Sequence, residues 1–257
     1  MQVIIPMSGM GTRFLEAGYD KPKPLIEVDG KPIIDHVVNL FGSDDEFLFI
    51  CNEKHIDEFQ IDEYVKSLVA KAKVFVVPSH APKGPIYDII LASGLIDDDK
   101  PTLVNYCDFN QYWDYQDFKV FVAERELDGA VICYKGFHPH LLGDDFYAGC
   151  RTDEDLNLLE IKEKHSFTPN KMDTFQSSGT YYFGSGRILK KYGMRIMDEG
   201  ISVNGEFYAS LPYSLMIEDG LKNAVYPVEY FCQWGTPRDL KEYQYWSEIF
   251  KKHQYAG

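Results

Sequence analysis

The sequence predicts an α/β fold in which a mainly parallel, Rossmann-like mixed sheet is flanked by helices. Short runs rich in Val, Ile and Phe alternate with longer amphipathic stretches through the first half of the chain, as in βαβ units with a buried sheet. No linker, repeat or low-complexity segment interrupts the 257 residues. We therefore expect one domain over 1–257, with a first half at 1–135 and a second half at 136–257.

In the first half, each short apolar run indicates a strand and each amphipathic run a helix. The strands are expected at 3–6, 47–51, 74–77, 103–106 and 130–134. The helices between them are expected at 32–40, 56–71, 87–93 and 118–125. Ligands of such sheets bind beyond the carboxyl ends of the strands.

The second half has a different pattern, with β-rich segments at 156–164 and 175–183. Helices are expected near 206–219 and 237–252. This half is predicted to form a β-rich lobe on the same sheet. Aromatic residues make up 15% of the chain, which leaves room for a homodimer contact on the last helix.

The composition excludes several classes of partner. A formal charge of −14 argues against nucleic-acid and anionic-membrane surfaces, because both need basic footprints. The five cysteines include no Cys-x-x-Cys pair, and no apolar run approaches the ~20 residues of a membrane span. We expect a cytoplasmic protein with reduced thiols.

The most informative stretch follows the first predicted strand. A glycine loop containing Gly9 and Gly11 comes directly after the strand, so its backbone N–H groups can face an anion without a Cβ in the way. Arg13 adds a bidentate donor for phosphate oxygens. Lys23 lies between Pro22 and Pro24, which hold it on a stiff arm. Together these residues predict a polyphosphate site.

The runs Gly-x-Gly-Thr-Arg-Phe at 9–14 and Lys-Pro-Lys-Pro-Leu-Ile-Glu-Val-Asp-Gly-Lys-Pro-Ile-Ile at 21–34 resemble the opening signature of the sugar-phosphate nucleotidylyltransferases, a family that includes phosphocholine cytidylyltransferases. The resemblance implies a Mg²⁺-dependent enzyme that transfers a nucleoside monophosphate from an NTP to a phosphorylated small molecule. The first half would then bind the nucleotide and the second half the acceptor. It implies catalytic roles for Arg13 and Lys23. The implied nucleotide-binding residues are Met7, Ser8, Gly9, Gly11, Thr12, Ser79 and Gly84.

Asp108 is the best candidate metal ligand. It follows the predicted strand at 103–106 and precedes an expected loop at 109–111, and one carboxylate with phosphate oxygens and water is a usual way to hold Mg²⁺. The family has a second aspartate two residues before its C-terminal Gly-Thr, and here Gln233 stands in that place. Either Gln233 is a weaker ligand or another acid, such as Glu206, completes the site.

The segment that would read the base also differs from relatives. Many uridylyl and thymidylyl members carry glutamine where Ser79 stands, and a glutamine amide complements uracil and thymine. Its loss favours CTP. Gly84 would let a base edge approach the backbone.

For the acceptor, the pair Glu163-Lys164 and the strand residue Gly179 resemble family residues that line its pocket. Ala148 stands where many sugar-activating members have glycine. The acceptor stays open among a sugar phosphate, phosphocholine and phosphoglutamine, and the resemblance favours precursor synthesis for capsule or surface polysaccharide. The alternatives are a non-catalytic nucleotide- or sugar-phosphate-binding regulatory subunit and a sugar-1-phosphate uridylyl- or thymidylyltransferase. A nucleotide-sugar glycosyltransferase would need an Asp-x-Asp motif after a strand, which the chain lacks.

Overall fold

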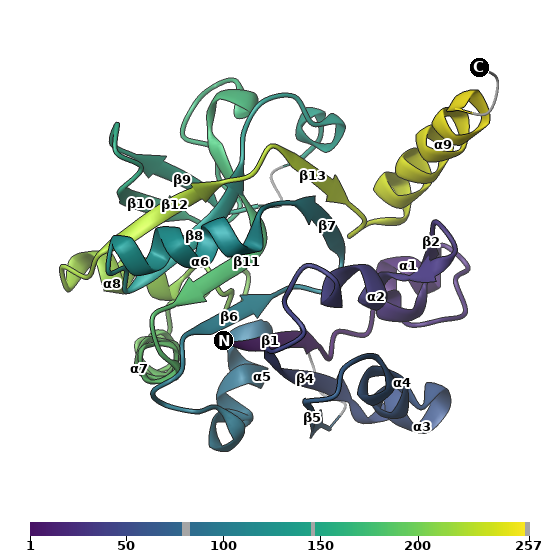
Figure 1. The fold of residues 1–257 in the computed structure, drawn as a ribbon, viewed down its shortest axis with the longest axis horizontal. Helices are drawn as coiled ribbons and strands as arrows, with labels where there is room; N and C mark the ends of the chain where they lie inside the picture. The colour runs from purple at the N-terminus through teal and green to yellow at the C-terminus, as the bar shows by residue number, and fades with distance from the viewer. Residues whose placement is uncertain (79–82, 145–146, 255–257) are drawn as a thin grey trace.

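The computed structural model describes residues 1–78, 83–144 and 147–254. Nine strands of these described residues form one mixed sheet, and two separate two-stranded ribbons accompany it. Helices lie on both sides of the sheet (Figure 1). The predicted fold class, α/β with a largely parallel central sheet, is confirmed.

The strands are β1 (Gln2–Met7), β2 (Glu27–Val28), β3 (Lys31–Pro32), β4 (Glu46–Asn52), β5 (Ala72–Val77), β6 (Thr102–Asn105), β7 (Phe109–Tyr112), β8 (Gly129–Tyr134), β9 (Gly149–Thr152), β10 (Leu158–Lys162), β11 (Phe175–Phe183), β12 (Asn223–Pro227) and β13 (Tyr230–Gln233). The α-helices are α1 (Thr12–Glu16), α2 (Ile33–Val38), α3 (Glu53–Phe59), α4 (Ile61–Leu68), α5 (Pro85–Leu91), α6 (Tyr115–Glu124), α7 (Gly186–Asp198), α8 (Pro212–Glu218) and α9 (Pro237–Gln254). Short 3₁₀ turns lie at Lys23–Leu25, Ser93–Leu95, Pro139–Leu142 and Lys171–Asp173.

The two halves of the chain contribute mostly different kinds of strand pairing to the sheet, although β12 of the second half pairs in parallel with β8. In the first half, β1 pairs in parallel with β4 and β6, and β4 pairs in parallel with β5. In the second half, the long strand β11 runs antiparallel to β6, β8 and β9. Since β11 lies between β6 and β8, strands of both halves belong to one sheet.

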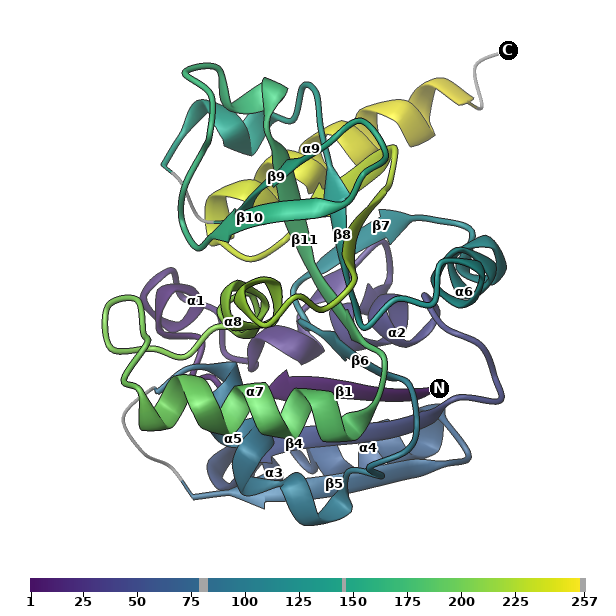
Figure 2. The ribbon, with the colours of Figure 1, turned by 90° about the vertical axis from the view of Figure 1, so that its left-hand side faces the viewer.

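Side chains alternate between two apolar layers because successive residues of a strand point to opposite faces. On β1, Val3 and Ile5 pack into the layer under α2, α4 and α6, whereas Ile4 packs into the layer under α5, α7 and α8. All three are fully buried. Figure 2 shows α5 and α7 lying across one face of the sheet. Burial on both faces explains why the strands are continuous apolar runs.

The structure differs from the helix predictions in two places. The helix expected over 56–71 is two helices, α3 and α4, because Gln60 takes a left-handed conformation (φ 52°) between them. Helix α7 was not predicted, and its glycines at 186 and 193 lower its helix propensity. A Cβ on Gly193 would lie 2.9 Å from Ile90 of α5. Close packing of α7 on α5 therefore requires a residue that local propensity disfavours.

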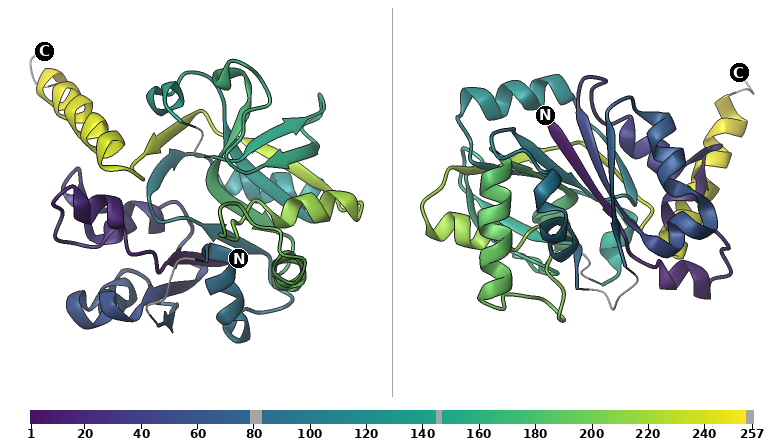
Figure 3. Two further views of the ribbon diagram at one scale, coloured as in Figure 1. Left: turned by 180° about the vertical axis from the view of Figure 1, so that it is seen from behind. Right: turned by 90° about the horizontal axis from the view of Figure 1, so that it is seen from below.

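Helix α9 extends away from the sheet (Figure 3). It is hydrogen-bonded to the hairpin of β2 and β3. The Asp29 carboxylate in that hairpin accepts hydrogen bonds from Tyr243 (2.9 Å) and Ser247 (2.7 Å). Trp246 and Phe250 are exposed on α9, and the homodimer contact there stays a prediction. No helix in the described part of the chain is long and apolar enough to span a membrane.

Candidate active site

Two cavities meet beyond the carboxyl ends of β1 and β6. The first, about 250 Å³, is lined by the loop after β1, the ends of β4 and β5, the start of α5 and residues 106–108. The second, about 410 Å³, is lined by α1, residues 163–164, the middle of β11 and Gln233, Gly235 and Thr236. Both are lined by Gly9, Met10, Gly11, Lys23, Tyr106, Asp108, Glu206 and Tyr208. The predicted phosphate loop thus lies where the cavities join.

The conformation of the glycine loop accounts for Gly11. Gly11 is left-handed (φ 64°) and begins α1, and its carbonyl accepts the Phe14 N–H at 2.8 Å. A Cβ on Gly9 would meet nothing within 4 Å, so the backbone there is open. Met7, Ser8, Gly9 and Gly11 line the first cavity, whereas Thr12 lines the second.

Lys23 and Asp108 form an ion pair at the junction. The Lys23 Nζ lies 3.1 Å from Asp108 Oδ2, and both side chains are partly buried. Lys23 begins the turn between its two prolines, with Pro22 extended before it. Arg13, exposed on α1, lines the second cavity beside the junction. The structure therefore brings the two predicted cations to the loop from separate elements.

Gln233 comes next to Asp108 through the ribbon of β7 and β13. Gln233 pairs with Phe109, and the Trp234 N–H donates to the Asp108 carbonyl at 3.1 Å. A Cβ on Gly235 would lie 2.9 Å from Asp108 Oδ2 and 3.1 Å from Gln233 Nε2. The side chains of Asp108 and Gln233 therefore both lie against Gly235, where a Cβ would be too close to them.

The loop expected at 109–111 was a wrong prediction, because these residues belong to strand β7. The partner strand β13 lies over a hundred residues downstream, so local sequence gave no signal for the pairing. Phe109 and Phe231 pack against each other across the ribbon, with ring centroids 5.4 Å apart. This packing helps to fix the position of Asp108 just before β7.

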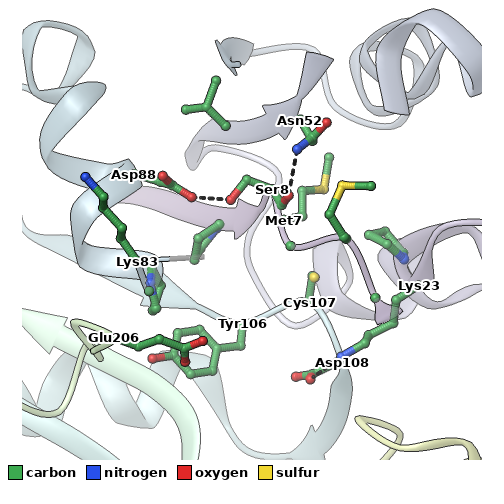
Figure 4. Close-up of a pocket in the computed structure, with 18 of the residues that line it drawn as sticks. Met7, Ser8, Lys23, Asn52, Lys83, Asp88, Tyr106, Cys107, Asp108 and Glu206 are labelled. Atoms are coloured by element: carbon green, nitrogen blue, oxygen red, sulfur yellow. Dashed lines mark hydrogen bonds and ion pairs between the residues drawn. The ribbon is translucent and has the colours of Figure 1, made fainter. Parts of the chain in front are cut away.

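Glu206 lies in a different hydrogen-bonded group. Its carboxylate accepts from the Tyr208 hydroxyl, which in turn accepts from Lys164 Nζ at 2.7 Å. Figure 4 shows Glu206 on the far side of Tyr106 from the Lys23–Asp108 pair. The described residues contain no cluster of three or more His, Cys, Asp or Glu side chains placed to hold a metal.

The donor set at the junction nevertheless fits Mg²⁺. That ion is usually held by one or two carboxylates and substrate phosphates, and it keeps several waters. Asp108 supplies one carboxylate, and the amide group of Gln233 lies against the same glycine, Gly235. A metal bound here would take most of its ligands from substrate and solvent.

Glu163 faces the second cavity from a partly buried position. Its Oε2 accepts a hydrogen bond from Ser210 Oγ at 2.6 Å. Burial raises the pKa of Glu163 to about 7, against the opposing effects of the Ser210 bond and the Lys164 charge. This carboxyl group therefore changes charge near neutral pH.

Gly179 lies at an irregularity in β11. The register with β8 shifts between Ser177 and Thr180, and Gly179 has φ 98°. A Cβ there would lie 3.0 Å from Phe109 and 3.2 Å from Tyr106. The glycine thus lets the strand bend close to two aromatic rings on the wall of the second cavity.

The predicted base-reading segment is only partly described. Ser79 lies outside the described residues. Gly84 lines the first cavity with φ 88°, and a Cβ there would lie 2.4 Å from the Phe207 backbone nitrogen. The Phe207 N–H donates to the Lys83 carbonyl at 2.8 Å. Close approach of two chain segments is therefore one reason for glycine at this position.

Sequence reasoning missed several residues that line the first cavity. Asp88 is only 6% exposed, and its carboxylate accepts a hydrogen bond from Ser8 Oγ. Asn52 Nδ2 donates to the Ser8 carbonyl at 3.2 Å. A carboxylate within the otherwise apolar run Ile86-Tyr87-Asp88-Ile89-Ile90 was the available signal, because an acid on a buried helix face needs a polar partner.

The chain resembles known proteins along most of its length. A family model described as nucleotidyl transferase matches residues 2–244. The bifunctional protein GlmU of Methanococcus maripaludis is 25% identical over 242 residues, which are 93% of this chain and 53% of that protein. The glucose-1-phosphate cytidylyltransferase of Salmonella typhimurium is 36% identical over 56 residues, 21% of this chain and 22% of that protein. The chain thus matches about half or less of the length of these relatives.

Solved structures share the fold. The nucleoside-diphosphate-sugar pyrophosphorylase of Vibrio cholerae RC9 aligns with a TM-score of 0.74 at 20% identity, covering 94% of this chain and 99% of that one. A UDP-glucose pyrophosphorylase complexed with UDP-glucose aligns with a TM-score of 0.73 at 15% identity, covering 98% of each chain. The inositol-1-phosphate CTP transferase of T. maritima aligns with a TM-score of 0.69 at 16% identity, covering 96% and 95%.

Proposed function

Because the chain belongs to the nucleotidyl transferase family, we propose that it transfers a nucleoside monophosphate, CMP from CTP, to a phosphorylated small molecule. Pyrophosphate is the second product. The observation that carries this proposal is the junction of two cavities at a glycine loop flanked by Lys23 and Asp108. A transferase needs two substrates to meet at one phosphorus, and this geometry provides the meeting point.

In this proposal, the first cavity takes the nucleoside and the second takes the acceptor. The triphosphate lies along the Gly9–Gly11 loop, and the acceptor phosphate enters from the side of Lys164. An acceptor oxygen forms a bond to the α-phosphorus in line with the bond to pyrophosphate, which breaks. The acceptor phosphate is ionised at neutral pH, so the step needs no general base. Positioning and charge neutralisation by Arg13 and Lys23 supply the catalysis.

We assign the metal site to Asp108, with Gln233 as the neutral second ligand. A bound Mg²⁺ would neutralise the phosphate charge that Arg13 and Lys23 leave uncompensated. The Lys23 ammonium, 3.1 Å from Asp108 in the described structure, would then face the phosphates as well as the carboxylate. Glu206 bonds Tyr208 instead, which supports Gln233 over Glu206 at the metal.

The names of the relatives support a phosphorylated acceptor, but they specify different nucleotides. Among them are a glucose-1-phosphate cytidylyltransferase, an inositol-1-phosphate CTP transferase and a mannose-1-phosphate guanylyltransferase. The second cavity of this chain carries both a cationic residue for phosphate, Lys164, and carboxylates for the rest of an acceptor, Glu163 and Glu206. We place the product among the activated precursors of capsule or surface polysaccharide.

The test is pyrophosphate release from each of CTP, UTP, ATP and GTP, in the presence of Mg²⁺ and a panel of acceptors. The panel includes glucose 1-phosphate, phosphocholine and inositol 1-phosphate. We expect release with CTP and one acceptor, and product formation in equal amount. Nucleotide binding without release in any combination would contradict the proposal and favour a regulatory nucleotide-binding subunit. Release with UTP alone would favour a uridylyltransferase.

A further inference from the structure

A buried carboxylate lies in the first cavity, away from the reacting centre. Asp88 on α5 is 6% exposed and lines this cavity but not the second. Its Oδ2 accepts a hydrogen bond from Ser8 Oγ (Figure 4). The Ser8 carbonyl is in turn held by Asn52 Nδ2 at 3.2 Å. The transfer step described above gives this carboxylate no role.

The position of the phosphates fixes where the base must lie. The Gly9–Gly11 loop, Lys23 and Asp108 belong to both cavities, so the triphosphate occupies that shared end. The nucleoside must extend from there into the part of the first cavity that the acceptor does not share. That part includes Ser8, Asn52, Val77, Lys83, Gly84 and Asp88. Asp88 is the acidic side chain in this set.

We propose that Asp88, oriented by Ser8, accepts a hydrogen bond from an exocyclic amine of the base and so selects cytosine over uracil and thymine. This inference rests on the proposed function, because it assumes a nucleotide in the first cavity. An ionised carboxylate only accepts hydrogen bonds. Cytosine offers an amine at position 4, where uracil and thymine offer a carbonyl oxygen. Facing Asp88, that oxygen would meet another acceptor instead of a donor, and a buried acceptor without a donor is costly.

The hydrogen bond from Ser8 orients Asp88 for the proposed contact with the base. The hydroxyl of Ser8 donates to one carboxylate oxygen of Asp88, and an ionised carboxylate can only accept further hydrogen bonds. An amide at position 88 could present either an oxygen or an NH₂ group to the base after a flip. Asp88→Asn therefore keeps the size of the side chain and removes the reason to prefer an amine.

The experiment is calorimetric titration of CTP, UTP, ATP and GTP into the protein with Mg²⁺ and without acceptor. We expect the wild type to bind CTP at least about tenfold more tightly than UTP, and Asp88→Asn to bring the two affinities to within about threefold. Asp35→Asn is the matched control, because Asp35 also accepts a hydrogen bond from a hydroxyl (Tyr64, 2.8 Å) but lines neither cavity. The Asp35→Asn variant should keep the wild-type ratio of CTP to UTP affinity.

Two results would overturn the inference. One is equal binding of UTP and CTP by the wild type, a measurement that does not depend on whether Asp88→Asn folds. The other is an unchanged ratio of CTP to UTP affinity in a folded Asp88→Asn protein. That result would mean that Asp88 only stabilises the glycine loop through Ser8. A preference for ATP or GTP over UTP that Asp88→Asn removes would support the amine contact with a purine. Because binding is measured without transfer, failure of the proposed activity shows separately, as an absence of pyrophosphate release.

Discussion

The two cavities share the Lys23–Asp108 pair, but the chain builds them in different ways. The loop that begins the first cavity comes from one run of sequence, residues 7–24, at the end of a parallel strand. The second cavity collects residues from 147–236 around an irregular antiparallel strand and a two-stranded ribbon. The phosphate-binding loop that we propose therefore depends mainly on local backbone geometry, whereas the proposed acceptor pocket depends on long-range packing.

The charged side chains of the two cavities partly overlap. Lys23 lines both cavities, and Arg13 lines the second one next to the open backbone of the glycine loop. The second cavity places Glu163 and Glu206 beside Lys164, with Tyr208 bonded to both the lysine and Glu206. In a chain of net charge −14, these cations lie where we propose that phosphates bind. The following changes test whether the two cavities are as distinct as this comparison implies.

The largest effect is expected at the phosphate end. Arg13→Ala and Lys23→Ala should each leave the fold intact and lower turnover by about 10²- to 10³-fold, because each removes a positive charge that stabilises the transition state. Steady-state pyrophosphate release measures this. Lys21→Ala is the matched control, since Lys21 lies on the same arm but pairs with Glu27 at the surface. Near-normal turnover in both active-site variants would remove the phosphate site from this loop.

The metal site comes next. Chelation by EDTA should abolish activity and Mg²⁺ should restore it, and Asp108→Asn should raise the metal concentration for half-maximal activity by about 10- to 100-fold. The amide keeps the shape but loses the charge that attracts the ion. Asp117→Asn, whose carboxylate accepts from Tyr226 at 2.7 Å outside both cavities, should match the wild type. An unchanged metal dependence in Asp108→Asn would place the ion elsewhere.

The pH dependence of folding stability should report on Glu163, which lines the second cavity but not the first. Since burial raises the pKa of Glu163 from 4.5 to about 7, the folded state holds a proton that the unfolded state releases. Its stabilising effect is full below pH 4.5 and is lost as pH rises through 7. Between pH 5 and 8 the wild type should lose about 2 kcal/mol of stability relative to Glu163→Gln, as read from urea unfolding.

The control for this titration is Glu160→Gln on the neighbouring strand. Hydrogen bonds from Lys162 and Arg151 lower the pKa of Glu160, so this group stays ionised in folded and unfolded chains over the same pH range. The stability difference between Glu160→Gln and the wild type should not change from pH 5 to 8. A flat difference for Glu163→Gln as well would mean that Glu163 is ionised in the folded protein throughout.

The smallest effect is expected at Gln233. Gln233→Asp adds a carboxylate beside Asp108 and should tighten Mg²⁺ binding to the nucleotide-free protein by about tenfold. Turnover should change little, because equal stabilisation of ground and transition states does not accelerate the step. Calorimetric titration of Mg²⁺ into wild type and variant measures the affinity. Equal affinities would show that Gln233 does not reach the ion.

The sequence by itself determined the parallel strands and the position of the glycine loop after the first of them. Apolar runs such as the one around Ile4 encode a buried strand, and Gly11, Arg13 and Lys23 follow within twenty residues. The physical reason is that strand burial, left-handed turns and proline-stiffened arms are set by neighbouring residues.

Only the tertiary structure decided which distant residues meet. It paired β7 with β13 to bring Gln233 over Gly235 beside Asp108, and it brought Asp88 to Ser8 across eighty residues. Local periodicity carries no information on such partners. These distant partners are fixed when the strands of the sheet pair. Glycines such as Gly179 and Gly193 also allow two segments to approach more closely than side chains permit.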